Sequence, residues 1–149
     1  MLINTHRFGP MEVDGERIIT FKNGLLGFPD ARRFALIQTS CDPVFFWLQS
    51  ADRQELAFVV CDPLAFVPDY QVPVRQDDVD AVGLDDLADG QVLVIVNKVE
   101  DQLTANLLGP LLIGAAGLLG KQLVLSDKRY GTRHPLTRAR PVRAVARIA

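Results

Sequence analysis

The alternation of hydrophobic and polar positions along the chain predicts many short strands and little helix. Residues 92–96 are five consecutive apolar residues, mostly β-branched, and a polar turn at residues 97–102 follows them. Such a run is typical of a strand that is buried on both faces. A second apolar run, residues 103–113, comes next, so we expect the two runs to form neighbouring elements at the centre of the core.

Shorter patterns before and after this pair predict further strands. Asp14 and Gly15 separate two alternating segments, which favours a two-residue hairpin turn. The loop at residues 22–30 is unusually apolar, so its apolar side chains either tuck under the sheet or form a contact surface. Pro73 cannot donate to a ladder, which places its strand at a sheet edge. One helical turn is expected at residues 30–33, and strands are expected at residues 34–38, 44–49, 56–60, 70–74 and 122–125.

Residues 77–90 have a different pattern, with apolar residues at near-helical spacing among aspartates. The six aspartates are at positions 77, 78, 80, 85, 86 and 89. We expect a short amphipathic helix or two helical turns, broken at Gly83. Asp77 is the predicted N-cap, because a carboxylate there can accept the first free backbone N–H groups and suits the positive end of the helix dipole.

These elements predict a mainly β fold. Seven to nine short strands, one short acidic helix and few other helical turns favour an antiparallel sheet curled into a barrel or a sandwich. The periodicity does not decide between these two architectures. A chain of 149 residues fits one domain, which we place at residues 1–136. Residues 137–149 have a different composition and are predicted to form a basic, flexible tail.

Charge is distributed unevenly along the chain. Residues 1–120 carry 8 basic and 17 acidic side chains, whereas residues 121–149 carry 8 basic and 1 acidic side chain. Such asymmetry indicates either an acidic body with a basic tail that binds nucleic acid or an acidic partner, or a solvated tail without a partner. We expect the tail to become helical only against an acidic or apolar surface, which is either a partner or residues 77–89 of this chain.

The sequence lacks the spacing of a nucleotide-binding loop. The glycine-rich residues 114–122 resemble one superficially, but Ala115 and Gln122 stand where a P-loop requires a glycine and a hydroxyl. We therefore interpret this segment as a hairpin loop. Phe45, Phe46 and Trp47 follow one another without interleaved basic residues, which favours core packing over a nucleic-acid stacking platform.

No titratable residues show the spacing of a catalytic or metal site. His6 and His134 are the only histidines and lie near opposite ends of the chain. Cys41 and Cys61 have no second ligand at zinc-site spacing, and we interpret both as reduced, mostly buried thiols. We therefore expect no cofactor, no metal and no enzymatic activity.

No apolar run approaches the eighteen or so residues that a membrane helix needs, and the first residues lack the pattern of a secretory signal. We therefore expect a soluble, cytoplasmic protein without membrane contact.

Five short motifs, in order along the chain, resemble the flagellar assembly factor FliW family. They cover residues from about Phe8 to Leu136, and together they are far more specific than any one alone. The motifs are Phe46-Trp47-Leu48-Gln49-Ser50; Asp62-Pro63 with Phe66-Val67-Pro68-Asp69-Tyr70; LTANL (residues 103–107) with PLLI (residues 110–113); Gly120-Lys121-Gln122; and Arg133-His134-Pro135-Leu136.

The resemblance implies a β-barrel-like fold and a function. FliW-like proteins bind flagellin in the cytoplasm and bind the RNA-binding translational regulator CsrA, whose repression of flagellin translation they antagonise without contacting the message. An acidic helix suits this role, because negative charge beside an RNA-binding surface repels phosphate. The candidate partner-binding residues are Leu103, Thr104, Ala105, Asn106 and Leu107, by motif match, and Asp80, Asp85 and Asp86, by charge.

Alternatives remain open at this point. Thr104 and Asn106 either contribute to a partner surface or cap a turn. The protein as a whole could instead bind nucleic acid directly through its tail, with a steep salt dependence, or be a split-barrel-like enzyme that carries a coloured cofactor.

Overall fold

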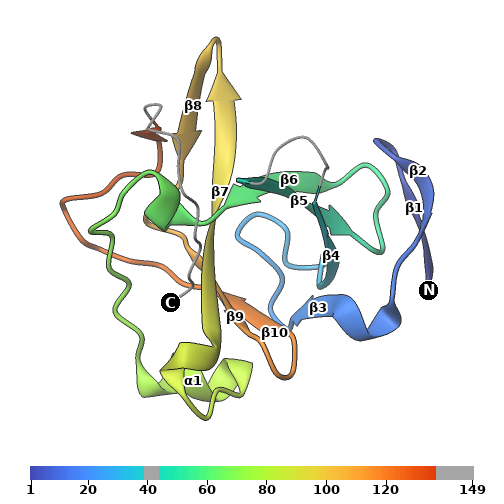
Figure 1. The fold of residues 1–149 in the computed structure, drawn as a ribbon, viewed down its shortest axis with the longest axis horizontal. Helices are drawn as coiled ribbons and strands as arrows, with labels where there is room; N and C mark the ends of the chain where they lie inside the picture. Colours follow the sequence, from blue (N-terminus) through green and yellow to red (C-terminus); the bar gives the residue numbers. More distant parts are fainter. Residues whose placement is uncertain (39–43, 137–149) are drawn as a thin grey trace.

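The computed structural model describes residues 1–38 and 44–136 (Figure 1). The described elements follow one another in this order: β1 (Leu2–Thr5), β2 (Gly9–Glu12), η1 (Gly15–Arg17), β3 (Ile18–Phe21), β4 (Arg33–Gln38), β5 (Phe45–Ser50), β6 (Ala57–Cys61), η2 (Pro63–Ala65), α1 (Gln76–Val82), η3 (Leu87–Asp89), β7 (Gly90–Val99), β8 (Gln102–Ala105), β9 (Leu111–Gly114), β10 (Leu119–Gln122) and β11 (His134–Pro135). Here η marks a three-residue 3-10 helix.

Seven of these strands close into a barrel. Strands β3 to β7 pair in sequence order, β7 pairs with β9, β9 pairs with β10, and β10 returns to β3. The mainly β, barrel-like fold predicted from the sequence is therefore confirmed, and the barrel is favoured over the sandwich. The sheet is antiparallel except at one seam, because β10 lies parallel to β3 with Leu119 opposite Thr20.

Strand β7 occupies the centre of the sheet, as its apolar run predicted. Its first half pairs with β9 from Gly90 to Leu93, and its second half pairs with β6 on one side and β8 on the other. In Figure 1, β7 and β8 extend together beyond the barrel. The second predicted run, residues 103–113, supplies both β8 and β9, so both halves of it are neighbours of β7.

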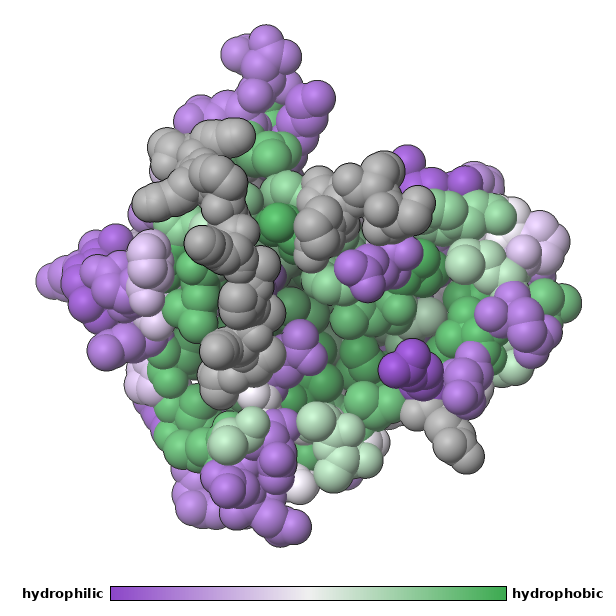
Figure 2. All heavy atoms as spheres, viewed as in Figure 1, coloured by the Kyte–Doolittle hydropathy of each residue, from purple (hydrophilic) through white to green (hydrophobic). Residues whose placement is uncertain are grey.

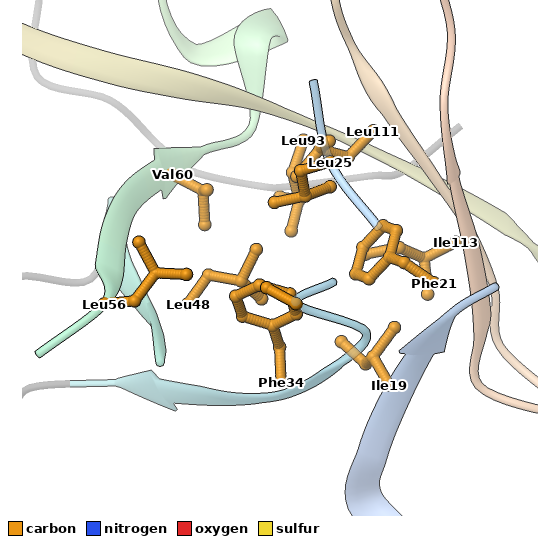
Figure 3. Close-up of a cluster of buried hydrophobic side chains, with 11 residues drawn as sticks. Ile19, Phe21, Leu25, Phe34, Leu48, Leu56, Val60, Leu93, Leu111 and Ile113 are labelled. Atoms are coloured by element: carbon orange, nitrogen blue, oxygen red, sulfur yellow. The ribbon is translucent and has the colours of Figure 1, made fainter. Parts of the chain in front are cut away.

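The barrel interior is filled by large apolar side chains that alternate along the strands (Figure 3). Phe21, Phe34, Leu48 and Val60 are fully buried there, and the Phe21 and Phe34 rings meet edge to face with 5.7 Å between their centroids. Each fully buried side chain of this size contributes about 1.5–3 kcal/mol relative to an exposed one. This core explains why short strands of four to six residues hold together.

The loop at residues 22–30 has three large apolar side chains, and two of them tuck under the sheet, which was one of the two expectations. Leu25 enters the barrel core, and Phe28 packs against it. Leu26 remains exposed on the surface. Gly24 has φ of 67° and lies against the backbone of Phe28 and Pro29, so only glycine fits this tight turn.

The predicted hairpin at Asp14 and Gly15 is wrong. Gly15 begins the 3-10 helix η1, which the bond from the Arg17 N–H to the Asp14 carbonyl closes at 2.9 Å. The actual hairpin joins β1 to β2, and its turn ends at Gly9, which has φ of 69°. The Asp-Gly pair favours a hairpin turn locally, but β3 pairs with β4 and β10 in the barrel and not with the strand before it.

Three smaller expectations also differ from the structure. Residues 70–74 form no strand, because Val72 and Val74 pack one-sidedly against neighbouring core clusters instead of joining a ladder. Residues 30–33 contain no helical turn, since a turn closed by the bond from the Ala31 N–H to the Phe28 carbonyl precedes β4. The last long strand, β10, begins and ends about three residues before the predicted position at residues 122–125.

The acidic segment contains the helix predicted for it. Helix α1 ends at Gly83, which has φ of 69° and so takes the left-handed conformation common after helices. The predicted cap is wrong: the helix begins after Arg75, not at Asp77, and the Asp78 carboxylate accepts the Arg75 N–H at 3.0 Å. Helix α1 packs against β9 and β10, where a side chain on Gly114 would lie 2.4 Å from the Val82 carbonyl oxygen.

Candidate functional site

The motif at residues 103–107 lies mainly inside the molecule. Thr104, Ala105 and Leu107 are buried, while Leu103 and Asn106 are half-buried. Ala105 and Leu107 belong to a second core cluster outside the barrel. Only Leu103 and Asn106 therefore offer side-chain surface that a partner can reach in this structure.

The polar residues of this motif have different roles. The Asn106 Oδ1 atom accepts the Leu108 N–H at 3.1 Å and so caps a turn. Thr104 makes no such cap, because its buried Oγ1 atom has no hydrogen-bond partner among the described residues. The Tyr70 hydroxyl, from another part of the chain, donates to the Leu107 carbonyl of the motif at 2.6 Å. Burial raises the pKa of Tyr70.

The Gly120-Lys121-Gln122 motif joins three distant segments. Gly120 packs directly against the Phe21 ring, and Lys121 pairs with Asp78. The Gln122 side chain donates to the Gly109 carbonyl at 3.0 Å and accepts the Leu26 N–H at 2.7 Å. Each residue of this motif therefore has a structural role.

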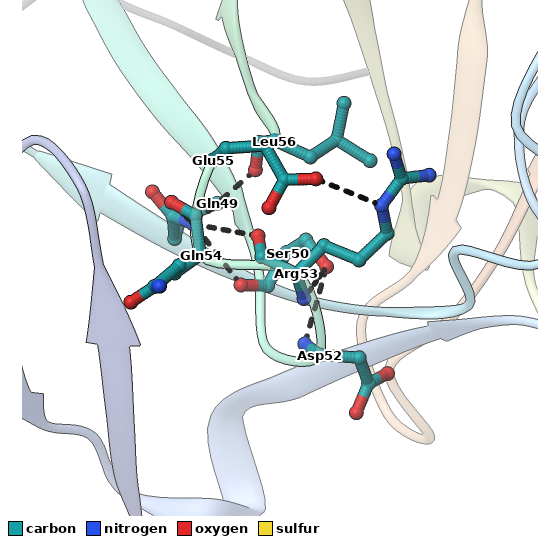
Figure 4. A network of polar contacts seen from close by, with 7 residues as sticks. All are labelled: Gln49, Ser50, Asp52, Arg53, Gln54, Glu55 and Leu56. Atoms are coloured by element: carbon teal, nitrogen blue, oxygen red, sulfur yellow. Dashed lines mark hydrogen bonds and ion pairs between the residues drawn. The ribbon is translucent and has the colours of Figure 1, made fainter.

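The Phe46–Ser50 motif organises the loop between β5 and β6 (Figure 4). The buried Gln49 Nε2 atom lies 3.1–3.4 Å from four backbone carbonyl oxygens of that loop. The Ser50 hydroxyl accepts the backbone N–H groups of Asp52 and Arg53. Because the amide nitrogen carries two N–H bonds, these carbonyls share its donors, and the contacts tie the loop to the end of β5.

Asp78 is the exception among the six aspartates of the acidic segment. It is only 8% exposed, and its Oδ1 atom lies 2.7 Å from the Lys121 Nζ atom. Burial alone would raise the pKa of Asp78, but the hydrogen bonds from Lys121 and from the Arg75 N–H together lower it. This carboxylate fastens α1 to β10 and is not part of the solvated acidic face expected from the sequence.

The other five aspartates form an exposed acidic surface, and they include the three candidate residues Asp80, Asp85 and Asp86. Gln76 donates to Asp80 at 2.9 Å, and Asp86 accepts the Ala88 N–H at 3.0 Å at the start of η3. None of the ion pairs found among the described residues involves any of these five side chains. Their charge is therefore available to a partner.

An apolar groove lies directly beside this acidic surface. It has a volume of about 200 Å³. In Figure 2, hydrophobic side chains gather above the hydrophilic projection at the bottom of the view, where Figure 1 places α1. The residues that line the groove come from η2, the irregular segment after it, the acidic segment and strands β7 and β9: Asp62, Pro63, Leu64, Tyr70, Val72, Val74, Leu84, Leu87, Gly90, Val92 and Leu112.

The groove was not predicted from the sequence. Two of its lining residues, Leu64 and Leu87, are large hydrophobic side chains that remain exposed. Leu87 offered a signal, because it lies among aspartates in a segment too short to bury it. The other walls come from residues far apart in the chain, and only the fold brings them together.

The remaining candidate groups have structural explanations. Cys61 is a free, fully buried thiol, and burial followed by the nearby Asp62 raises its pKa to about 12. Cys41 lies outside the described residues. His134 packs in β11 opposite Ala105. Trp47 is only half-buried, on the outside of the barrel, where the Arg7 guanidinium carbon lies 4.0 Å from its ring centroid.

In the described part of the chain, no three histidine, cysteine, aspartate or glutamate side chains come together in a way that could hold a metal ion. No helix in it is long and apolar enough to cross a membrane.

Known proteins with similar sequences identify the family to which the fold described above belongs. A family model described as FliW protein matches residues 2–136. The flagellar assembly factor FliW of Natranaerobius thermophilus is 38% identical over 139 residues, which cover 91% of this chain and 92% of the relative. That of Bacillus subtilis (strain 168) is 33% identical over 138 residues, which cover 91% of this chain and 96% of the relative.

A solved structure is also similar to this one. The crystal structure of a flagellar assembly factor FliW superposes with a TM-score of 0.85 at 30% identity, covering 93% of this chain and 98% of that chain. The matches run through the barrel, the acidic segment and all five motifs. The chain therefore belongs to the FliW family of flagellar assembly factors, which are not enzymes.

Proposed function

We propose that the protein binds flagellin in the cytoplasm and antagonises the translational regulator CsrA by protein–protein contact. In this role it couples the amount of unexported flagellin to flagellin translation. The observation that carries the proposal is an apolar groove beside five exposed aspartates that form no ion pair with any other described residue, on a member of the FliW family. The Leu107 carbonyl of the buried motif accepts the hydroxyl of Tyr70, which lines the groove.

The two parts of this surface suit two kinds of contact. The groove can take apolar side chains of a partner, with the exposed Leu64 and Leu87 as contact points. The aspartates Asp80, Asp85 and Asp86 extend a negative field that repels RNA phosphate from any RNA-binding surface docked nearby. Leu103 and Asn106 stay candidate contacts at the edge of the second core cluster.

The proposal is tested with purified flagellin and CsrA. We expect each to co-elute with this protein and to give measurable heat in calorimetry, and we expect excess flagellin to lower the amount of CsrA bound. Absence of heat and of co-elution with both partners would show that the proposal is wrong. Direct binding of RNA by the protein alone, with a steep salt dependence, would favour the nucleic-acid alternative instead.

A further inference from the structure

The apolar groove is too small for a typical cofactor or metabolite. Its volume of about 200 Å³ is below the roughly 300–1,000 Å³ of most small-molecule sites. Its lining is almost entirely apolar, with Asp62 as the charged residue among the lining side chains. A groove of this size suits two or three short aliphatic side chains presented by a peptide segment.

The surroundings of the groove specify the charge of that segment. Leu84, Leu87 and Gly90 line the groove, and the exposed Asp85, Asp86 and Asp89 lie between them in the sequence. An occupant that brings cationic side chains beside its apolar ones would pair with these carboxylates at a partly desolvated boundary, where such pairs are stronger than in open water. The fitting occupant is therefore basic on one side and aliphatic on the other.

The chain carries such a segment at its own end. Residues 137–149, which lie outside the described residues, contain four arginines and no acidic residue. At the 3.6-residue helical period, Arg140, Arg143 and Arg147 fall on one side, and Val142, Val145 and Ala149 fall on the other. Pro141 suits the first turn of a helix.

The end of the described chain lies close enough for this segment to reach the groove. Leu136 is buried in the same core cluster as Tyr70, Val72 and Val92, and these three residues also line the groove. Thirteen residues span about 20 Å as a helix and about 45 Å when extended. The groove is therefore within reach in either form.

We infer that residues 137–149 are an intramolecular occupant of the apolar groove. The aliphatic side of this segment suits the groove, and Arg140, Arg143 and Arg147 complement the charge of Asp85, Asp86 and Asp89. The contact competes with any external protein that uses the same groove. A partner must therefore bind the groove tightly enough to displace residues 137–149. This inference goes beyond the proposed function, because it concerns two parts of one chain and needs neither flagellin nor CsrA.

The test uses the full chain with a silenced tail, Val142→Asp with Val145→Asp, and a synthetic peptide of residues 137–149. Calorimetry is expected to show binding of the peptide that weakens with rising salt. Leu87→Ser in the groove should weaken it about tenfold. Leu26→Ser is the matched control, because the exposures of Leu87 and Leu26 are 59% and 61%, and it should leave binding unchanged. Leu64→Ser provides a second groove variant if the first is unstable.

Three results would overturn the inference. One is absence of peptide binding up to millimolar concentration. Another is equal binding by a scrambled peptide of the same composition, which would reduce the effect to charge. The third is an equal loss of peptide affinity in the Leu26→Ser and Leu87→Ser variants. Flagellin binding that depends on Leu87 when the peptide does not bind would assign the groove to that partner and leave the proposed function intact.

Discussion

At the scale of single residues, Asp78 shows how a charge that looks solvated in the sequence becomes structural. Its neighbours Asp77 and Asp80 are exposed, but Asp78 is turned inward to Lys121 and to the Arg75 N–H. Nothing in the local sequence separates Asp78 from the other five aspartates, because its partner lies 43 positions away. Only the docking of α1 on β10 reveals the pair.

We predict that Asp78→Asn lowers the free energy of unfolding by about 1–3 kcal/mol at neutral pH, since a hydrogen-bonded charge is lost. The lowered pKa means that this stabilisation is present above the unfolded pKa of about 4 and is lost as pH falls through the folded pKa. Urea unfolding of both proteins from pH 7 to pH 3 should therefore show the difference shrinking at the acid end. Asp77→Asn is the control and should stay within about 0.5 kcal/mol of the parent. A difference that does not change with pH would contradict the ion pair.

At the scale of elements, the acidic segment is the part of the candidate site that the sequence predicted best. Its helix, its break at Gly83 and its exposed charge follow from local spacing and composition, which need no knowledge of the rest of the fold. The motif at residues 103–107 was predicted less well as a contact surface, because a sequence match does not distinguish a residue that touches a partner from one that supports the fold. The burial of Ala105 and Leu107 makes that distinction.

The predicted strands also divide into those that a local pattern determines and those that depend on a distant partner. Strands β4, β5 and β6 were found close to their true positions, because each is an apolar run with polar boundaries. Strand β7 was placed correctly but too short, because it continues through Asn97 and Lys98, which were predicted to belong to a polar turn. The N-terminal hairpin and residues 70–74 were misjudged, since the choice between ladder, turn and one-sided packing depends on a distant partner. The order of strands around the barrel is set by the same distant contacts.

We predict that changing Asp80, Asp85 and Asp86 together to lysine weakens relief of CsrA repression while the fold is retained. The reason is that the repulsive field toward RNA is removed, whereas the lost cap of η3 costs only about 1 kcal/mol. A reporter of flagellin translation, read in low salt where fields reach furthest, measures the effect. The control changes the exposed residues Asp30, Glu100 and Asp101 to lysine, which alters net charge equally at other places. Equal relief by both triple variants would rule out the electrostatic account.

At the scale of the whole molecule, the parallel seam between β3 and β10 closes the barrel. The seam could not be predicted from the sequence. Its two strands have four residues each and are separated by most of the chain, so no local pattern indicates that they pair. Gly120 is required at this seam, since a side chain there would lie 2.5 Å from the buried Phe21 ring.

We predict that Gly120→Ala lowers the free energy of unfolding by about 1–3 kcal/mol, because the close-packed ring cannot move aside without strain. Gly117→Ala in the same hairpin meets nothing closer than 4.0 Å and should change stability by less than about 0.5 kcal/mol. Thermal unfolding followed by circular dichroism compares the two. Equal stability of both variants would show that the seam tolerates a wider spacing.

The same seam places a condition on how the protein is made. Thr20 is among the first residues to be synthesised, but its partner Leu119 is added only when most of the chain exists. A nascent or truncated product that ends between β9 and β10 is an open sheet, with β3 and β9 as unpaired edges that invite aggregation or proteolysis. Such long-range pairing is also intrinsically slow to form. A ribosome that stops before Gln122 therefore leaves a sheet that cannot close, and the supply of the closed barrel follows synthesis beyond β10.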